Sequence, residues 1–313
     1  MRRFIFTLLA FTFVISAFAQ GNKKMSNENN SPWKKGVSIS VIGGQGGSRN
    51  WPSGGDRFSL SFAGYLNLYA NRSWGKNTWD NSIDLGYAFI NTSSVGVRKE
   101  DDKIDLYVKY GYQLKNNKWK FGAVGNLRTQ MTNGFDYSYE KPRRNSGFFA
   151  PAFLVFGPGF NYKAWNHFDV FLSPVAARWV IATNKPYSFN YQGGIKPDGT
   201  PETPLASFYG VDPERKVHFE AGPYFSFMYN GNLFKNVVYK SRLDLFSDFG
   251  EQEPGNIDWY WTNTIGMKVN KFLQVTYNFD VIYDDNTRMF GPLQNKTAAQ
   301  LRSMLGVGLM AKF

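Results

Sequence analysis

The sequence lacks cysteine and has only two histidines, His167 and His218. Without cysteine the chain forms no disulfide, and it has no attachment site for the lipid of a bacterial lipoprotein. A hydrolase based on histidine needs that side chain beside a nucleophile, with a third group to orient it. Neither histidine has a serine in such an arrangement, so we predict that the protein is not an enzyme and has no catalytic residues.

Beyond the first twenty residues the sequence also lacks long apolar runs. At its start, two arginines precede an apolar stretch from 4 to 15, and Ala17-Phe18-Ala19 has the small-x-small pattern of a cleavage site. The stretch is shorter than the roughly 20 residues of a spanning helix. We therefore predict a cleaved signal peptide at residues 1–19 and a disordered periplasmic lead-in at residues 20–32, which are rich in Asn, Lys and Ser. A membrane span must then be built from strands.

Long segments of alternating apolar and polar residues occupy the rest of the chain. Between Ile104 and Tyr112, for example, the even-numbered residues are apolar or aromatic and alternate with Asp105 and Lys109. Soluble strands usually run about 5 to 6 residues, whereas a tilted membrane strand needs roughly 9 to 11. The alternation here lasts long enough for a membrane strand in segments near 33–47, 57–71, 78–91, 102–114, 118–131, 148–162, 167–182, 215–229, 236–249, 256–269, 272–284 and 299–313.

The last segment has the pattern of the strand that closes bacterial outer-membrane barrels, with Leu305, Val307, Leu309 and Phe313 on one face. Short turns on the periplasmic side and long loops outside are expected of a barrel with both termini in the periplasm. We therefore predict an all-β fold over residues 33–313, a transmembrane antiparallel up-and-down β-barrel of about 12 strands in the outer membrane of a Gram-negative bacterium. The predicted connections are short near 71–76, 115–117, 163–166, 230–235 and 269–271, and long near 48–57, 92–101, 132–147, 183–214, 250–255 and 285–298.

Tryptophan gathers at the ends of the predicted strands. Aromatic residues form two girdles at the membrane interfaces of such barrels. Tryptophans scattered through an ordinary core would not concentrate at strand ends. The girdle residues that we predict are Trp74, Trp79, Trp119 and Trp165 on the periplasmic side, and Trp179, Trp259 and Trp261 on the outer side.

The inward face of the predicted strands carries charges of both signs. Unpaired charge in a narrow barrel would cost several kcal/mol per ion. These groups are therefore either paired, giving a solid polar plug, or wet, giving a narrow channel with a modest cationic bias. Inward glycines such as Gly86 either leave space in the interior or relieve strand curvature. The main lumen-lining residues that we predict are Lys109, Lys120, Arg128, His218, Glu220, Lys240, Arg242, Asp244, Asp258 and Arg302.

Two predicted loops bear on function. The glycine-rich loop Gly43–Gly55, which contains Trp51, either folds inward to constrict the mouth or is a mobile surface loop. The loop from Asn184 to Glu214 is long and aromatic, and loops of that length are usually functional or disordered. We predict that it contacts a ligand or partner through Tyr187, Phe189, Tyr191, Phe208 and Tyr209.

Adjacent carboxylates occur at two predicted outer strand ends, at Asp101-Asp102 and at Asp284-Asp285. Carboxylates and loop carbonyls are ligands that calcium prefers. The two pairs lack the regular spacing of a calcium-binding loop, and solvation of strand ends explains them more simply. We predict no metal site and no cofactor.

A series of short motifs follows the chain in order. It consists of Asn50-Trp51 with Gly54-Gly55, Trp79-Asp80-Asn81-Ser82, Asp101-Asp102-Lys103-Ile104, Tyr110-Gly111-Tyr112, Ala150-Pro151-Ala152, Phe171-Leu172-Ser173-Pro174, Tyr209-Gly210-Val211-Asp212-Pro213, Leu243-Asp244-Leu245-Phe246-Ser247, Ile282-Tyr283-Asp284-Asp285 and Leu305-Gly306-Val307-Gly308. In this order the motifs resemble a family of Bacteroidota outer-membrane proteins known as a domain of unknown function, DUF3078, over roughly residues 33–313. One departure is the ending Met310-Ala311-Lys312-Phe313, where the family pattern is Tyr-Lys-Phe. The resemblance implies compartment and lineage, and it brings no established activity and no functional residue.

Three functional hypotheses follow. The first is a structural or accessory subunit of a larger outer-membrane assembly, because no catalytic or ligand-recognition constellation is present. The second is a narrow diffusion channel for small polar or anionic solutes, and the third, much weaker, is an outer-membrane hydrolase. The expected contacts are outer-membrane lipids, including lipopolysaccharide. Without Arg2 and Arg3 the formal net charge of +12 falls to +10, and this excess reflects either affinity for lipopolysaccharide or anionic solutes or, more simply, solvated loop lysines. Other outer-membrane proteins are the expected protein partners, and nucleic acid is not an expected one.

Overall fold

The computed structural model describes residues 32–48, 56–116, 118–137, 139, 141–165, 167–250, 255–291 and 295–312. The predicted signal peptide, nearly all of the predicted lead-in, Trp51 and Phe313 lie outside these residues. In the described segments, no helix has both the length and the apolar character that crossing a membrane requires.

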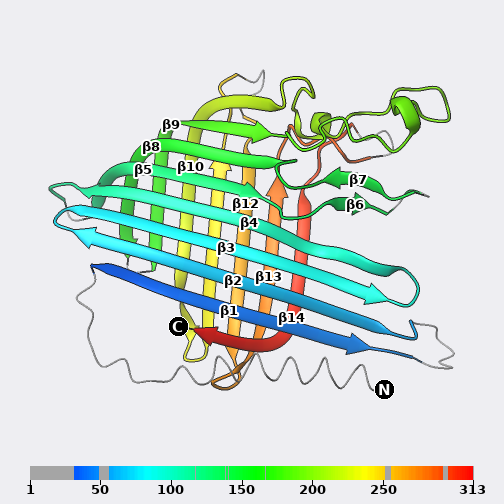
Figure 1. The fold of residues 1–313 in the computed structure, drawn as a ribbon. Helices are drawn as coiled ribbons and strands as arrows, with labels where there is room; N and C mark the ends of the chain where they lie inside the picture. The colour runs from blue at the N-terminus through cyan, green and yellow to red at the C-terminus, as the bar shows by residue number, and fades with distance from the viewer. Residues whose placement is uncertain are drawn as a thin grey trace. The chain divides into compact units, whose positions relative to one another are not determined.

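Twelve antiparallel strands close into a barrel (Figure 1). Around the ring they follow the chain order, and β1 finally pairs with β14. The predicted fold class, an all-β up-and-down barrel of twelve strands, is therefore confirmed. The barrel strands are β1 (Trp33–Gly46), β2 (Ser59–Trp74), β3 (Asn77–Thr92), β4 (Gly96–Gln113), β5 (Trp119–Thr129), β8 (Ala152–Trp165), β9 (Phe168–Ile181), β10 (Val217–Phe234), β11 (Val237–Phe246), β12 (Asp258–Lys268), β13 (Leu273–Tyr283) and β14 (Gln300–Lys312).

Alternation decides which side chains face outward. On β3, Ile83 stands opposite Leu68 of β2 and Leu106 of β4, so apolar side chains lie side by side across three strands. Cross-strand neighbours of this kind stabilise a sheet face. On β14 the outward Leu305 and Leu309 are exposed. The outer surface of the wall is therefore apolar, as lipid contact requires.

The connections sort into two rims. The short-turn rim holds the connections 75–76, 114–118, 166–167, 235–236 and 269–272, and the long-loop rim holds 47–58, 93–95, 130–151, 182–216, 247–257 and 284–299. The predicted long loop at 92–101 is wrong. β4 begins at Gly96, so only residues 93–95 connect it to β3. The charged run Arg98 to Asp102 looked like a loop, but it continues the strand toward the long-loop rim.

Residues 43–46 of the predicted glycine-rich loop are the end of β1 and pair with β2. They neither fold inward nor form a surface loop. The remaining central part of that predicted loop, residues 49–55, lies outside the described residues.

Gly86 shows what one of the inward glycines does. It pairs with Tyr65 of β2, and a Cβ atom at Gly86 would lie 3.0 Å from the tyrosine ring. The Tyr65 hydroxyl continues inward and donates to Asp101 at 3.3 Å. The missing side chain therefore makes room for an aromatic ring and does not leave open space.

Six of the predicted girdle tryptophans have described side chains, and they lie near the two rims. Trp74, Trp79 and Trp119 lie at strand ends on the short-turn rim. Near the long-loop rim, the Trp179 ring packs on a phenylalanine and the Trp259 ring on a tyrosine, and Trp261 lies two residues further along β12. The Trp165 side chain is not among the described parts of the structure. The girdle role stays a prediction, with this placement in its favour.

We expect Ile83→Arg to lower the free energy of unfolding from phospholipid vesicles by about 2–4 kcal/mol, because it puts a charge at the middle of the outer surface. Urea titration followed by gel mobility measures the change. The control is Val95→Arg, in the exposed 93–95 turn, which should shift the free energy by no more than about 0.5 kcal/mol. Equal losses in the two variants would contradict the outward assignment of Ile83.

Candidate functional site

Charged side chains meet across the interior of the barrel. Side chains on strands that are not neighbours in a closed ring can touch only inside it. Arg242 of β11 lies 3.5 Å from Asp105 of β4, and β5, β8, β9 and β10 separate these two strands on one side of the ring. Arg128 of β5 likewise binds Asp244 of β11. We call the inward ion pairs of the barrel the luminal network.

Asp244 lies at the centre of this network. It accepts hydrogen bonds from Ser226 at 2.7 Å and from the Tyr224 hydroxyl at 3.0 Å, and Arg242 Nη2 lies 2.8 Å from its other oxygen. Buried carboxylates need such partners, since an unpaired one costs several kcal/mol. This carboxylate is therefore fully occupied by its neighbours.

Aromatic rings complete the centre of the network. The Arg128 guanidinium carbon lies 3.8 Å from the ring centroid of Tyr260, and that of Arg242 lies 4.4 Å from the ring centroid of Tyr107. Such cation–π contacts contribute about 2 kcal/mol when they are desolvated. The centre of the barrel is thus filled by paired charges and rings.

Arg178 of β9 forms a second cluster nearer the long-loop rim. Its Nε atom lies 2.8 Å from Glu220 and its Nη2 atom 2.6 Å from Asp284, and it also binds Asp258. The side chain is buried, with an exposed fraction of 6%. One guanidinium therefore serves three carboxylates from three parts of the chain, and the planar fork of arginine suits this task.

The acidic pair at Asp284-Asp285 belongs to this cluster. Carboxylate oxygens of Asp258, Asp284 and Asp285 all lie within 4.8 Å of one another. Arg178 binds Asp258 and Asp284 directly. The other adjacent pair is divided, because Asp101 binds Arg302 of β14, whereas Asp102 turns toward the loop after β5.

The predicted cationic bias concerned a water-filled lumen and stays a prediction, whereas the groups that form ion pairs can be compared directly. The inward ion pairs of the barrel strands and of Asp284 involve the five cations Lys109, Arg128, Arg178, Arg242 and Arg302, and the eight carboxylates Asp101, Asp105, Asp169, Glu220, Asp244, Asp258, Asp280 and Asp284. Carboxylates therefore outnumber cations in the described ion pairs of the network. Sequence reasoning missed several of these carboxylates. Asp284 lies just past the end of β13, and the irregularity beside Ala88 shifts the alternation of β4 so that Asp101 points inward.

Most of the predicted lumen-lining residues meet in the network, and three do not. Lys120 donates to the Thr78 hydroxyl at 3.1 Å. The His218 side chain is 42% exposed and lies 3.7 Å from Glu220, and Lys240 is exposed. The seven residues that the network joins are Lys109, Arg128, Glu220, Arg242, Asp244, Asp258 and Arg302.

Sequence reasoning missed Arg178, which binds more carboxylates than any other cation in the described ion pairs. A signal was present, because Arg178 is the one charged residue in the apolar stretch from Val170 to Ile181. A lone arginine in an apolar strand needs a buried partner. The pairing of β9 shifts register with β10 beside Gly222 and also with β8. Because these shifts interrupt the regular alternation, the sequence alone does not tell which face of the sheet Arg178 occupies.

A second structure, which we call the cap, forms from two long-loop segments, residues 130–151 and 182–216. The first contains the two-stranded hairpin β6 (Gly134–Asp136) and β7 (Arg143–Ser146), and the second contains the 3-10 helices η1 (Gln192–Gly194) and η2 (Ala206–Tyr209). None of these elements was predicted. They fold because each segment supplies polar and apolar partners for the other.

A buried ion pair joins the two segments of the cap. Arg143 Nε lies 3.0 Å from Glu202, and both side chains are buried. Glu202 also accepts from the backbone N–H of Asn190 at 2.8 Å and of Tyr191 at 3.0 Å. A carboxylate held by three donors fixes the course of the loop around it.

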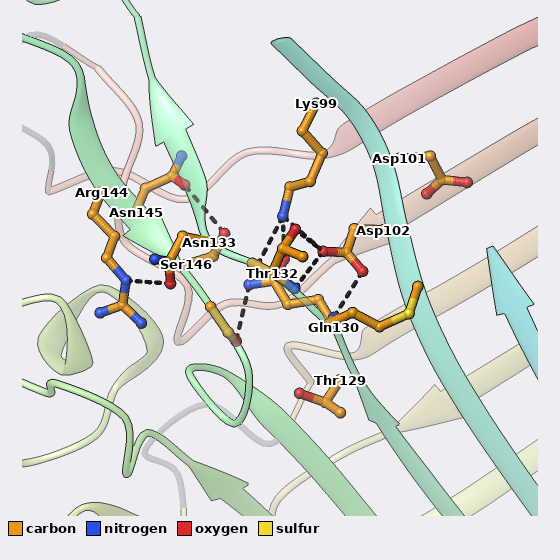
Figure 2. A network of polar contacts seen from close by, with 12 residues as sticks. Lys99, Asp101, Asp102, Thr129, Gln130, Thr132, Asn133, Arg144, Asn145 and Ser146 are labelled. Carbon is orange, nitrogen blue, oxygen red and sulfur yellow. Dashed lines mark hydrogen bonds and ion pairs between the residues drawn. The ribbon is translucent and has the colours of Figure 1, made fainter. Parts of the chain in front are cut away.

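The hairpin is anchored to β4, as Figure 2 shows. Asp102 accepts from the backbone N–H groups of Met131 and Thr132, both at 2.7 Å, and from Lys99 at 3.0 Å. On the opposite side of the hairpin, Arg144 donates to Asn133 at 2.9 Å (Figure 2). The acidic pair that sequence analysis considered for calcium therefore holds a loop through Asp102.

An apolar cluster seats the cap on the barrel. Leu205, Phe208 and Val211 pack with Val180 of β9 and with Ala150. Val180 follows Arg178 on the inward face, so the cluster lies at the inner side of the long-loop rim. The cap is thus packed against the mouth of the barrel by apolar contacts.

Two of the five residues predicted to contact a ligand or partner therefore lie inside the cap and offer no outer surface to a protein partner. Phe208 is 1% exposed and Tyr209 is 7% exposed, because they form the core of the cap. Burial raises the pKa of the Tyr209 hydroxyl, which donates to the Asn145 carbonyl at 2.6 Å. Tyr187, Phe189 and Tyr191 are exposed on the cap.

A cavity of about 370 Å³ lies between the network and the cap. Lys103, Arg128 and Tyr260 line it on the barrel side, and Ser146 and Tyr209 line it on the cap side. Its size is at the small end of the range for ligand sites. Its lining mixes charges of both signs with aromatic rings.

The two histidines have structural contacts in the described part of the chain. His167 Nδ1 lies 3.1 Å from the Asn230 carbonyl oxygen, and its ring packs on Tyr229. His218 lies near Glu220, as described above. Neither contact provides the nucleophile and orienting group of a hydrolase.

Residues 44–135 match the family described as "Protein of unknown function (DUF3078)". The predicted family resemblance is confirmed over this segment. The Bacteroidota lineage that the resemblance implied stays a prediction. A comparison with curated proteins finds no match.

Among solved structures, the chain is similar to an outer membrane channel from Pseudomonas putida F1, with 12% identity and a TM-score of 0.40 over 89% of this chain and 94% of that one. It is also similar to the NanC porin, with 10% identity and a TM-score of 0.35 over 87% and 98% of the two chains. A third is outer membrane phospholipase A from Escherichia coli, with 10% identity and a TM-score of 0.35 over 91% and 94%. At these values no activity is carried over to this chain.

We expect Arg178→Met to destabilise the protein by about 3–5 kcal/mol, because it leaves three buried carboxylates without their shared cation. Urea unfolding in vesicles measures the change. Lower pH should reduce the loss, since protonated carboxyl groups no longer repel one another.

The control for this variant is Arg215→Met. Arg215 and Asp212 form an exposed pair 3.7 Å apart, so its loss should cost at most about 1 kcal/mol. A loss for Arg178→Met as small as that of the control would show that the cluster does not hold the barrel together.

We expect Glu202→Gln to loosen the cap while the barrel stays folded, because Arg143 loses its buried partner. Limited proteolysis should cut the 182–216 segment at least tenfold faster, with heat-modifiable gel mobility unchanged. Asp198→Asn is the matched control, since Asp198 bonds only its neighbour Thr200 in the described contacts. Equal cleavage rates in the two variants would contradict the role of Glu202.

Proposed function

We propose that this protein is a filled outer-membrane β-barrel that acts as a structural or accessory subunit of a larger outer-membrane assembly. The observation that carries the proposal is the luminal network. Arg242 with Asp105, and Arg128 with Asp244, link strands on distant parts of the ring. A barrel whose interior is bridged by paired charges serves better as a scaffold than as a passage for solutes.

The outer membrane as the location rests on the architecture. A closed barrel leaves no sheet edge in lipid along most of its wall, and long strands with an apolar outer face suit a bilayer. The signal peptide and the placement of the short turns in the periplasm belong to the same proposal. The lipid contacts, including lipopolysaccharide, follow from this location.

The surface proposed for assembly is the exposed aromatic patch of the cap, which consists of Tyr187, Phe189 and Tyr191. The rings of Tyr187 and Phe189 lie 6.1 Å apart. Aromatic residues are enriched at protein interfaces because they bury a large area with little loss of conformational freedom. Glu202, the buried partner of Arg143, also accepts from the backbone N–H of Tyr191 and so holds this residue of the patch in place.

The second candidate function is a narrow channel for small polar solutes. The cavity between the network and the cap, and exposed interior groups such as Lys240, speak for it. The excess of carboxylates in the network makes anions a poor fit for such a channel. Ion current distinguishes a filled barrel from a channel directly.

We expect purified protein in a planar bilayer in 1 M KCl to give no steady ion current, because paired charges and rings occupy the interior. A known open porin, reconstituted in parallel, shows that insertion occurs under the same conditions. Steady, ohmic conductance steps from the wild-type protein would contradict the proposal and favour the channel.

We also expect the protein, extracted in mild detergent, to run above its monomer position in a native gel. Replacing Tyr187, Phe189 and Tyr191 together by serine should shift it to the monomer position. Phe249→Ser is the matched control, since Phe249 is an exposed aromatic residue outside the cap. Migration of the wild-type protein as a monomer in several detergents would contradict the accessory role.

A further inference from the structure

The seam between the first and last strands is the shortest pairing in the barrel wall. In the residues that the structure describes, β1 pairs with β14 from Ser38 to Ile42, opposite Lys312 to Gly308. β2 and β3, by comparison, pair from Ser59 to Trp74. Among the described residues, the part of β14 from Gln300 to Val307 is paired with β13 alone.

The course of β14 explains the short seam. The strand first runs beside β13 and then bends, so that its end lies along β1 (Figure 1). Gly306 and Gly308 occupy the bend, where a Cβ at Gly308 would lie 2.0 Å from the Val41 carbonyl oxygen. Beyond this point β1 continues to Gly46 beside β2 while β14 follows β13. In the described part of the chain, each strand therefore has a free edge on the long-loop side of the seam.

In the proposed outer-membrane location, the free edge of β14 faces lipid. The outward side chains of Leu301 and Leu305 are 70% and 71% exposed, because no neighbouring strand covers them on the β1 side. Roughly eight residues at about 3.4 Å each make an edge about 27 Å long, close to the thickness of the hydrocarbon core. Backbone groups left unpaired at this depth cost several kcal/mol each.

The edge also lacks the features that usually block pairing with another chain. Natural edge strands carry proline, outward lysine or bulges. Residues 300–307 contain no proline, and their one charge, Arg302, points inward to Asp101 and Asp280. Across the gap, Gly43, Gly44 and Gly46 at the end of β1 carry no side chains that would fill it.

We propose that the free edge of β14, Gln300–Val307, pairs with an extended strand from another outer-membrane protein. Lipid covers the apolar side chains but cannot bond the backbone, whereas an added strand does both. The strand runs antiparallel or parallel to β14 and presents apolar side chains at alternate positions to the bilayer. This inference rests on the proposed accessory function and names the chemistry of its partner contact.

The test uses a synthetic strand from the chain itself. The probe is a fluorescein-labelled peptide with the sequence of β13, Leu273–Tyr283, which already pairs with the opposite edge of β14. Its binding to the full-length protein in detergent micelles is followed by fluorescence anisotropy. A peptide of the same composition without alternation is the first control.

An engineered disulfide is used to close the gap. Because the native chain has no cysteine, the introduced pair forms the only disulfide. Gly46→Cys with Met304→Cys joins two positions that would be opposite if the Ser38–Ile42 register continued. We expect the oxidised double variant to bind the β13 peptide at least tenfold more weakly than its reduced form. The control is Leu68→Cys with Ile83→Cys, which links a position that is already paired and should leave binding unchanged.

Equal binding of the β13 peptide and the scrambled peptide, or equal binding by the oxidised and reduced double variants, would overturn the proposal. The reduced form of the same variant checks that the protein is folded. A wild-type protein that is monomeric in native gels but binds the peptide would refute the accessory function and leave the free edge standing. A wild-type protein that forms a complex in native gels but does not bind the peptide would support the accessory function and refute the free edge as the binding site.

Discussion

A charged side chain that points into a closed barrel loses most of its water and must find an opposite charge there. On a ring of strands that opposite charge comes largely from across the interior. Arg242 and Asp105, and Arg128 and Asp244, meet this requirement at the centre, and Arg178 meets it for three carboxylates near the long-loop rim. The filled interior follows from this requirement. The cap then packs against side chains that already lie at the long-loop rim.

Local alternation was enough to predict the wall of the barrel. In β3, for example, Ile83 and Leu85 alternate with Asp84 and Gly86, and the structure pairs Ile83 with apolar neighbours on both sides. Alternation fails where a strand is irregular. The change of phase near Asp101 and the late position of Asp284 concealed two carboxylates of the network, and Arg178 was concealed by irregular neighbours in the same way.

Local sequence patterns could not predict the cap, for a different reason. Phe208 and Tyr209 lie in a long polar loop, so the sequence indicated that they form a contact surface. In the structure they pack inside a small core with Leu205 and Val211. Two further members of that core, Val180 and Ala150, lie elsewhere in the sequence. The Arg143–Glu202 pair likewise joins two loops that are separated by two barrel strands and a turn. Nothing within either loop reveals that the other will supply its partner.

The central ion pairs join residues that are far apart in the sequence, and this separation also governs how the barrel forms. Arg128 and Asp244 are 116 residues apart in the chain, and neither lies in a hairpin with the other. A partly assembled sheet therefore holds these charges without their partners, exposed to water. Contacts of such separation are slow to form and arrive only after much chain has been ordered. Ring closure and charge pairing thus become one cooperative late step, so that half-built barrels gain little stability and the finished one resists opening strand by strand.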